Sequence, residues 1–364
     1  MTNYGNYPDL SQVRRILVIK LRHHGDVLLT SPVFSVFKSR FPQSEISAYI
    51  YKETFPILEG HPAIAGFHLY DRDWKSLSFW QRAVEETRLM REIKKQRYDL
   101  VINLTEGDRG AFVALLSNAG VRIGVKPEEQ GKYKQKIFTH LVKHCKHPRH
   151  TVEQNLDALR RIGIFPSYKE RDLFFHIPDS ARRTILKYLR EAGFQEGSYI
   201  LIHPTSRWMF KCWPADKVVR LIHRLNKEGY PLVISSSPDP KELSMIEQIL
   251  PLCHDISLLN IAGKLSLKEF GALIESSACL ICVDSLPVHI ASALKTPVAA
   301  IFGPSSEDAW GPWKNPGGRV IAENISCRPC NLDGCGGGKV CDCLEQLPVD
   351  RVFDEIKRVV SLTA

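Results

Sequence analysis

Three short segments combine residue types that could move a proton and hold a phosphate. In the first, His23–Phe34, Gly25 and Asp26 come directly after a buried apolar run and open an apolar helical stretch. Gly25 permits a tight turn from strand to helix, which places Asp26 at the start of the helix. A carboxylate there either caps the helix or acts as a general base that deprotonates a substrate hydroxyl. Asp26 is therefore the candidate catalytic residue, and a structural cap is the alternative.

The second segment, His203–Pro214, follows another apolar run and combines hydroxyl groups with cations. Thr205 and Ser206 supply the hydroxyls, and Arg207 and Lys211 supply positive charge in the same short loop. Several hydrogen-bond donors together with positive charge suit a diphosphate group. Thr205, Ser206 and Lys211 are therefore candidate donor-binding residues, and a polar surface loop is the alternative.

The third segment, Cys279–Pro304, begins with an apolar strand. Asp284 and Ser285 come directly after that strand, and Pro287 opens the helix that follows. Proline suits a first helical turn, and the unpaired amides of such a turn can bind an anion. His289 lies in the first turns, where it could contact a phosphate; the alternative is a packed helical histidine. Asp284, Ser285 and His289 complete the set of candidate donor-binding residues.

These segments follow apolar runs of strand length, and most of the runs are separated by amphipathic stretches of helix length. Such alternation predicts a doubly wound parallel sheet. The runs of the first half are Arg14–Leu21, Glu45–Tyr51, Phe67–Tyr70, Tyr98–Leu104 and Val121–Val125. The runs of the second half are Tyr199–Pro204, Tyr230–Ser237, Cys279–Asp284 and Pro297–Gly303. The expected helices include Trp80–Gln96, Ala215–Glu228, Leu267–Ser276 and the last segment, Val349–Val360.

Because the pattern restarts near residue 178, the sequence predicts an α/β protein of two doubly wound Rossmann-like domains. We expect an N-terminal domain at residues 1–177 and a C-terminal domain at 178–364, with the last helix packing back on the N-terminal one. The two domains are expected to face a central cleft. Ligands of such sheets bind beyond the carboxyl ends of the strands, where the three segments lie.

Composition sets broader bounds. The chain has 364 residues, 44% of them hydrophobic, and a formal net charge of +9. The positive charge favours acidic partners, but it is spread along the chain, so nucleic acid is not an expected partner. The polar first residues do not look like a signal peptide, and the apolar run that follows is too short to span a bilayer. We therefore expect a cytoplasmic protein.

Five of the ten cysteines crowd into one glycine-rich stretch. They are Cys327, Cys330, Cys335, Cys341 and Cys343. Their spacing fits a small structural zinc site, because zinc takes four thiolates in a tetrahedral arrangement. Free thiols are the alternative, and disulfides are disfavoured in the cytosol.

In this order the three motifs resemble those of the family 9 glycosyltransferases, the bacterial ADP-heptose heptosyltransferases. The likeness rests on Gly25 and Asp26 after the first strand, on the HPTSR segment that starts at His203, and on Asp284, Ser285 and His289. The segments RRILVIKLRHHGDVLLTSPV and YDLVINLT most resemble those of family members that add a side-branch heptose. The family often has glycine after the Asp-Thr or Asp-Ser pair, where this chain has Leu286.

The resemblance implies a GT-B fold and an inverting transfer of heptose from ADP-heptose to a heptose of the lipopolysaccharide inner core. Asp26 corresponds to the base, and the acceptor-binding and nucleotide-sugar-binding roles fall to the N- and C-terminal domains. No cofactor is expected for catalysis. The acceptor is a lipid A-linked inner-core oligosaccharide, so peripheral contact with the cytoplasmic face of the inner membrane is expected. Basic residues of the N-terminal half are the candidates for that contact, and a solvated basic surface is the alternative. They are Lys126, Lys132, Lys134, Lys136, Lys143, Lys146 and Arg149.

Two other functions remain open from the sequence. One is a heptosyltransferase that acts on a different core heptose. The other is a non-catalytic nucleotide-sugar-binding module. A dinucleotide-dependent enzyme is disfavoured because no G-x-G-x-x-G follows the first strand.

Overall fold

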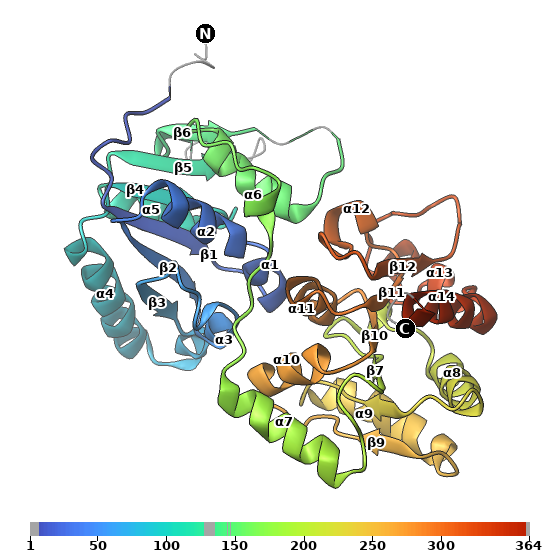
Figure 1. The fold of residues 1–364 in the computed structure, drawn as a ribbon. Coiled ribbons are helices and arrows are strands. Elements are labelled where there is room, and N and C mark those ends of the chain that lie inside the picture. The colour runs from blue at the N-terminus through green and yellow to red at the C-terminus, as the bar shows by residue number, and fades with distance from the viewer. Residues whose placement is uncertain (1–6, 127–134, 144, 146, 362–364) are drawn as a thin grey trace. The chain divides into compact units, whose positions relative to one another are not determined.

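The structure is a computed structural model that describes residues 7–126, 135–143, 145 and 147–361. The chain divides into two compact units, Met1–His176 and Ile177–Ala364, and each unit contains one six-stranded sheet. Figure 1 shows the course of the chain through both.

All paired strands are parallel, and both sheets have the same topology. The N-terminal sheet has the order β3-β2-β1-β4-β5-β6 and the C-terminal sheet the order β12-β11-β10-β7-β8-β9. The strands of the first are β1 (Arg15–Lys20), β2 (Glu45–Tyr51), β3 (Gly66–Tyr70), β4 (Leu100–Asn103), β5 (Val121–Val125) and β6 (His140–Val142). Those of the second are β7 (Ile200–His203), β8 (Leu232–Ile234), β9 (Leu258–Asn260), β10 (Cys279–Val283), β11 (Val298–Phe302) and β12 (Gly318–Ala322). Each order is that of a doubly wound Rossmann fold read from one edge, so the predicted fold class is confirmed.

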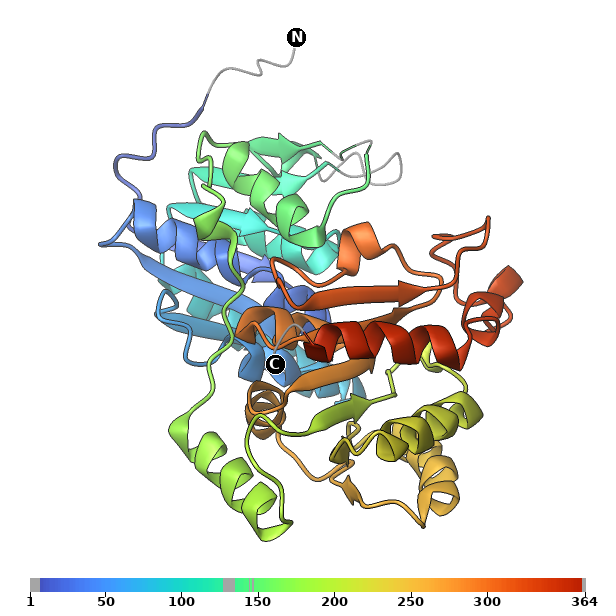
Figure 2. The same cartoon turned by 45° about the vertical axis from the view of Figure 1, so that its right-hand side comes forward.

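Helices cover both faces of each sheet (Figure 2). In the N-terminal unit, α2 packs with α6 and α4 packs with α5; in the C-terminal unit, α8 packs with α9 and α14, and α10 packs with α7 and α11. The N-terminal helices are α1 (His24–Leu28), α2 (Ser31–Arg40), α3 (Phe55–Leu58), α4 (Phe79–Lys95), α5 (Asp108–Leu116) and α6 (Thr151–Arg160). The C-terminal ones are α7 (Asp179–Glu191), α8 (Ala215–Lys227), α9 (Pro240–Ile249), α10 (Leu267–Glu275), α11 (Leu286–Leu294), α12 (Glu307–Trp310), α13 (Asp342–Glu345) and α14 (Val349–Ser361).

The central strands form because their apolar runs are buried on both faces, as parallel sheets require. In β1 every residue after Arg15 is buried, including Lys20. The edge strands β6 and β9 and the terminal strand β12 were not predicted. They are only partly buried, and β6 and β9 have three residues each, so they lack a long apolar signal.

The last helix packs within the C-terminal unit, and its expected packing on the N-terminal domain stays a prediction. Its apolar stripe, which includes Val352, Phe353 and Ile356, belongs to the hydrophobic core of that unit. The helix contacts α8, β11 and β12. Burial of this stripe accounts for the position of α14, because the stripe spans one face of the helix.

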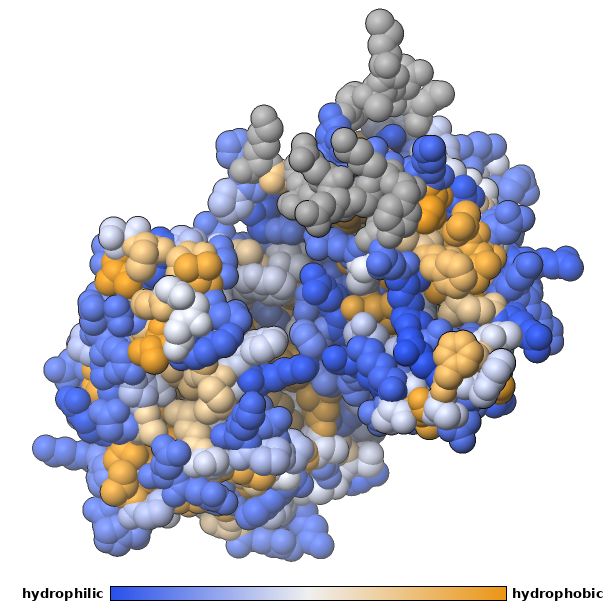
Figure 3. Space-filling view, turned by 180° about the vertical axis from the view of Figure 1, so that it is seen from behind, coloured by the Kyte–Doolittle hydropathy of each residue, from blue (hydrophilic) through white to orange (hydrophobic). Residues whose placement is uncertain are grey.

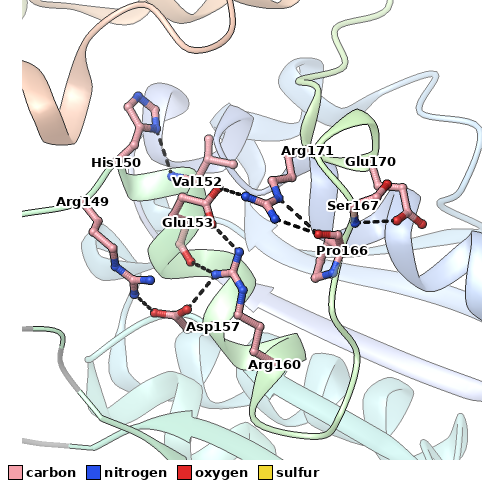
Figure 4. A network of polar contacts seen from close by, with 10 residues as sticks. All are labelled: Arg149, His150, Val152, Glu153, Asp157, Arg160, Pro166, Ser167, Glu170 and Arg171. Atoms are coloured by element: carbon pink, nitrogen blue, oxygen red, sulfur yellow. Dashed lines mark hydrogen bonds and ion pairs between the residues drawn. The ribbon is translucent and has the colours of Figure 1, made fainter.

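A polar network fixes α6 and the loop that follows it at the end of the N-terminal unit (Figure 4). Arg160 pairs with Glu153, and it also pairs with Asp157 at 2.8 Å. Arg171, in the loop beyond the helix, reaches Glu153 at 2.9 Å. Burial raises the pKa of Glu153, but the hydrogen bonds and charges of Arg160 and Arg171 outweigh it and lower the net value.

None of the helices in the described part of the chain is both long and apolar enough to cross a membrane.

Candidate active site

The candidate residues lie at the topological switch point of each sheet. Strand order reverses between β1 and β4 in the N-terminal unit and between β7 and β10 in the C-terminal unit. Open α/β sheets bind ligands outside the carboxyl ends of their strands at such a point. Asp26 follows β1, Thr205 and Ser206 follow β7, and Asp284 follows β10. The strand order therefore marks the same positions that the sequence motifs indicated.

Asp26 lies in the first turn of the short helix α1 and is not its N-cap. His23 holds the N-cap position, and no side chain caps this helix end. The Asp26 side chain is half-buried, and no hydrogen bond or ion pair of it is found within residues 7–361 as described. The cap alternative therefore does not hold, and the carboxylate oxygens are available to accept a proton.

A buried lysine lies near Asp26 and was not singled out from the sequence. Lys20, the last residue of β1, is 7% exposed, and its Nζ donates to Leu104 O at 3.1 Å and to Asn155 Oδ1 at 3.3 Å. Burial lowers the pKa of Lys20 to about 8, although the charge of Asp26 acts in the opposite direction. A cation at the end of an otherwise apolar strand was the available sequence signal, because lysine is almost never fully buried unless it is paired.

The loop after β7 is built on a buried carboxylate. Thr205 is fully buried, and its Oγ1 donates to Glu242 Oε2 at 2.6 Å. Ser206 is 4% exposed and its Oγ accepts the Trp208 amide at 3.3 Å. Since the Thr205 hydroxyl proton is held by Glu242, Thr205 shapes this loop more than it offers a free donor. Glu242, on α9, has no adjacent motif residue and was missed for that reason.

Lys211 and Asp284 form the closest contact between two of the motifs. Lys211 Nζ lies 2.6 Å from Asp284 Oδ2, although 73 positions separate them in the sequence. The Lys211 side chain is 21% exposed and that of Asp284 6%. The pair joins the β7 loop to the end of β10, so a cation and its counter-charge stand together at the switch point. An anion placed there would compete with Asp284 for the ammonium group.

Ser285 and His289 occupy the first turns of α11. Ser285 is the N-cap, but its Oγ donates to Val283 O at 3.1 Å and makes no cap hydrogen bond. Pro287 lies in the first turn, and the amides there face away from any intrahelical partner. His289 is 3% exposed, with its ring 6.3 Å from that of Trp310. The start of α11 therefore adds an anion-favouring helix terminus beside Asp284.

The expected structural zinc is not supported. Among the residues that the structure describes, no group of three or more His, Cys, Asp or Glu side chains could hold a metal ion. Cys341 and Cys343 are buried in the C-terminal core, whereas Cys327 and Cys335 are exposed. Burial raises the pKa of the Cys341 thiol to about 12, with further contributions from neighbouring thiols. Packing in the core explains the two buried cysteines.

Part of the basic surface that was assigned to a membrane lies outside the described residues. Lys132, Lys134 and Lys146 are among these. Of the others, Arg149 pairs with Asp157 in the α6 network and is therefore engaged within the unit.

A family model and a related protein both place the chain in the same family. The sequence model described as glycosyltransferase family 9 (heptosyltransferase) matches residues 86–340. Lipopolysaccharide heptosyltransferase 3 of Escherichia coli is 34% identical over 296 residues, which cover 81% of this chain and 85% of that protein.

Solved structures share the fold over nearly the whole chain. A family 9 glycosyltransferase from Veillonella parvula superposes with a TM-score of 0.81 at 21% identity, covering 98% of this chain and 99% of that one. The E. coli heptosyltransferase WaaC, solved with ADP-2-deoxy-2-fluoro heptose, gives a TM-score of 0.71 at 18% identity and covers 94% and 99%. At these identities the structures establish the fold.

Proposed function

Because the chain belongs to glycosyltransferase family 9, we propose that it transfers heptose from ADP-heptose to a heptose of the lipopolysaccharide inner core, in the manner of heptosyltransferase 3. The observation that carries the chemistry is the contact of Lys211 with Asp284 beside the start of α11. A cation and a helix N-terminus at one switch point suit a diphosphate leaving group. The C-terminal domain as predicted, residues 178–364, is thus proposed to hold the donor and the N-terminal domain, residues 1–177, the acceptor.

The proposed reaction is a single displacement that inverts the anomeric centre. The acceptor hydroxyl oxygen attacks the anomeric carbon of the heptose while the bond from that carbon to the diphosphate oxygen breaks. Asp26 accepts the hydroxyl proton, and ADP leaves with the bonding electrons. Negative charge develops on the diphosphate, so Lys211 and the amides of α11 stabilise the transition state more than the ground state.

The remaining motif residues have supporting roles in the proposal. Thr205, held by Glu242, and Ser206 shape the loop that carries Lys211. Ser285 and His289 contribute the helix start that approaches the diphosphate. No step of the proposal needs a metal ion, because the leaving-group charge is met by Lys211 and the helix amides.

Incubation of the protein with ADP-heptose and a truncated inner-core acceptor tests the activity. We expect ADP release that depends on the acceptor, and a product longer by one heptose. Product linkage separates a side-branch heptose from another core position. Donor binding without acceptor-dependent ADP release would instead indicate a non-catalytic nucleotide-sugar-binding module.

The role of Asp26 has its own test. We expect Asp26→Asn to lower kcat by at least about two orders of magnitude, the usual contribution of a general base. The variant should still fold, and its loss of thermal stability should be modest, because the half-buried carboxylate makes no hydrogen bond in the described chain and acts on Lys20 only through its charge. Asp354→Asn, at an exposed position of α14, is the matched control and should retain full activity. Near-normal turnover of the Asp26 variant would remove Asp26 from the role of base.

A further inference from the structure

Helix α4 exposes large apolar side chains on the outside of the N-terminal unit. Phe79 is 76% exposed, Trp80 77% and Val84 64%, and Leu77, just before the helix, is 38% exposed. The Phe79 and Trp80 rings meet edge to face with centroids 5.3 Å apart. Seen from behind, the surface carries apolar side chains among charged ones (Figure 3). Adjacent exposed side chains of this size mark an interaction surface rather than ordinary surface composition.

Positive side chains continue the same face toward the end of the helix. Trp80, Val84, Arg91 and Lys95 recur at helical spacing and line one shallow hollow along α4. Within the described chain, no ion pair is found for Arg91, Lys94 or Lys95. The outer face is therefore apolar at its start and cationic at its end.

Two of the three acidic residues of α4 are paired with arginines, and the third, Glu85, is one negative charge against the three of Arg91, Lys94 and Lys95. Glu86 is turned to Arg82 and Arg109, at 3.0 and 3.2 Å, on the side of the helix that meets α5. Glu92 pairs with Arg88 at 3.6 Å, so this pair is neutral. The opposite side of the helix buries Leu89 and Ile93 in the core of the unit. That packing holds α4 in place with its outer face directed to solvent.

We propose that this face of α4, together with Leu77, docks on an anionic phospholipid bilayer. Phe79 and Trp80 would enter the interfacial region, where aromatic side chains with an apolar body are favoured. Arg91, Lys94 and Lys95 would lie at the level of the headgroups, each attracted by acidic lipid. The combination of exposed aromatics with unpaired cations on one helix selects a lipid surface over an apolar protein partner.

The position of α4 in the sheet order gives this docking a consequence. The helix connects the carboxyl end of β3 to the start of β4, so Phe79 and Trp80 lie toward the carboxyl edge of the N-terminal sheet. The same edge of that unit carries Asp26 after β1. Docking through the start of α4 would thus bring the edge that bears the candidate base near the membrane. That Asp26 would there meet a lipid-linked acceptor rests on the proposed function, whereas the docking itself does not.

Vesicle co-sedimentation of the full chain, without donor or acceptor, tests the docking. We expect binding to vesicles of phosphatidylcholine that contain about 30% phosphatidylglycerol. Binding to vesicles of phosphatidylcholine alone should be much weaker. Reversal of two charges in Arg91→Glu/Lys95→Glu should weaken binding to the anionic vesicles at least about tenfold. Phe79→Ser/Trp80→Ser should weaken it by a similar factor, because the apolar contribution is lost.

Matched variants on the C-terminal unit serve as controls. Arg183→Glu/Arg190→Glu makes the same charge change on exposed positions of α7, and Leu252→Ser removes a side chain that is 58% exposed. Both should bind vesicles like the parent chain. If they lose binding to the same extent as the α4 variants, the effect is one of net charge or hydrophobicity and the proposal is overturned.

Two further measurements separate the alternatives. Brominated phospholipid should quench part of the tryptophan fluorescence of the parent chain, and Trp80→Phe, which keeps the apolar surface, should abolish that part. A dimer of the parent that dissociates in Phe79→Ser/Trp80→Ser, with vesicle binding unchanged, would assign the face to a second copy and overturn the proposal. Transfer to a water-soluble truncated acceptor should be equal in all these variants, so a failure of docking is distinct from a failure of the proposed function.

Discussion

At the scale of single residues, the candidate site contains two lysines that each lie near an aspartate. Lys211 contacts Asp284, and Lys20 lies within the electrostatic influence of Asp26. In both pairs at least one partner is nearly inaccessible to water. Removing one member of such a pair leaves the other in a poorly solvated position. The structural and catalytic contributions of each cation must therefore be measured separately.

The contribution of Lys211 can be separated with a double variant. We expect Lys211→Met to lower kcat by about 10² to 10³, because one stabilising charge on the leaving diphosphate is lost. It should also destabilise the fold, since Asp284 is left buried without its partner. The double variant Lys211→Met/Asp284→Asn should regain stability in urea unfolding without regaining activity. Recovery of activity along with stability would show that Lys211 acts only on the fold.

The buried ammonium of Lys20 predicts a pH dependence of stability. Its pKa is about 8 in the folded protein and roughly 10.4 in an unfolded chain. Between these values the unfolded chain binds more protons, so raising the pH favours the folded state. The free energy of unfolding of the parent minus that of Lys20→Met should therefore rise between pH 8 and pH 10, by up to about 1.4 kcal/mol per pH unit.

Urea unfolding of the parent and of Lys20→Met at pH 7, 8, 9 and 10 gives the difference between their free energies of unfolding. These pH values cover roughly the range between the folded and unfolded pKa of Lys20. Lys241→Met, at an exposed position near the start of α9, is the control and should give a difference that does not change with pH. A flat difference for Lys20 as well would mean that its ammonium is not desolvated in the folded protein.

At the scale of elements, α6 shows how paired charges fix a helix and the loop after it. Arg160 lies between Glu153 and Asp157 on the helix, and Arg171 ties the loop to Glu153. All four side chains are partly shielded from water, with exposed fractions from 15% to 28%. Such a network contributes more than isolated surface pairs, because each charge has several fixed partners.

We expect Arg160→Met to lower the free energy of unfolding by about 1–2 kcal/mol at pH 7. Because the pKa of Glu153 is lowered in the folded protein, its stabilising contribution is complete above the unfolded pKa of roughly 4.3 and is lost as the pH falls below it. The effect of the variant should therefore shrink at pH 3 (about one unit below that value). Arg88→Met, which breaks an exposed pair with Glu92, should cost less than about 0.5 kcal/mol at either pH.

At the scale of the whole molecule, the chain builds a separate hydrophobic core in each unit. The N-terminal core joins β1 and β2 with α4 and α5, and the C-terminal core joins β7, β10 and β11 with α8, α9 and α14. A unit with its own core resists unfolding through its own packing. Damage to one core should therefore be confined to that unit.

Ile356→Ala tests this independence. Ile356 is fully buried in the C-terminal core, so its truncation should cost about 2–5 kcal/mol. Hydrogen-exchange mass spectrometry should show lost protection in peptides from residues 177–361 and unchanged protection in the N-terminal unit. Leu252→Ala, at an exposed position, should leave both units unchanged. Loss of protection spread over both units would show that they unfold together.

The two-sheet fold is predictable from the sequence, because strands buried on both faces carry continuous apolar runs. The sequence also determined which loops carry the candidate residues, since these loops directly follow the apolar runs. The edge strands β6 and β9 were not predicted, because each has only three partly buried residues and so lacks a continuous apolar run.

Which of these residues contact one another depends on the three-dimensional arrangement of the strands. Sequence gives the order of strands along the chain but not their order in the sheet. It is the placement of β10 beside β7 that brings Asp284 to Lys211. The same holds for Lys20, whose partners are Leu104, just after β4, and Asn155 of α6, and for Glu242, which accepts the Thr205 hydroxyl. Such contacts depend on packing between segments far apart in the chain, which local residue patterns do not encode.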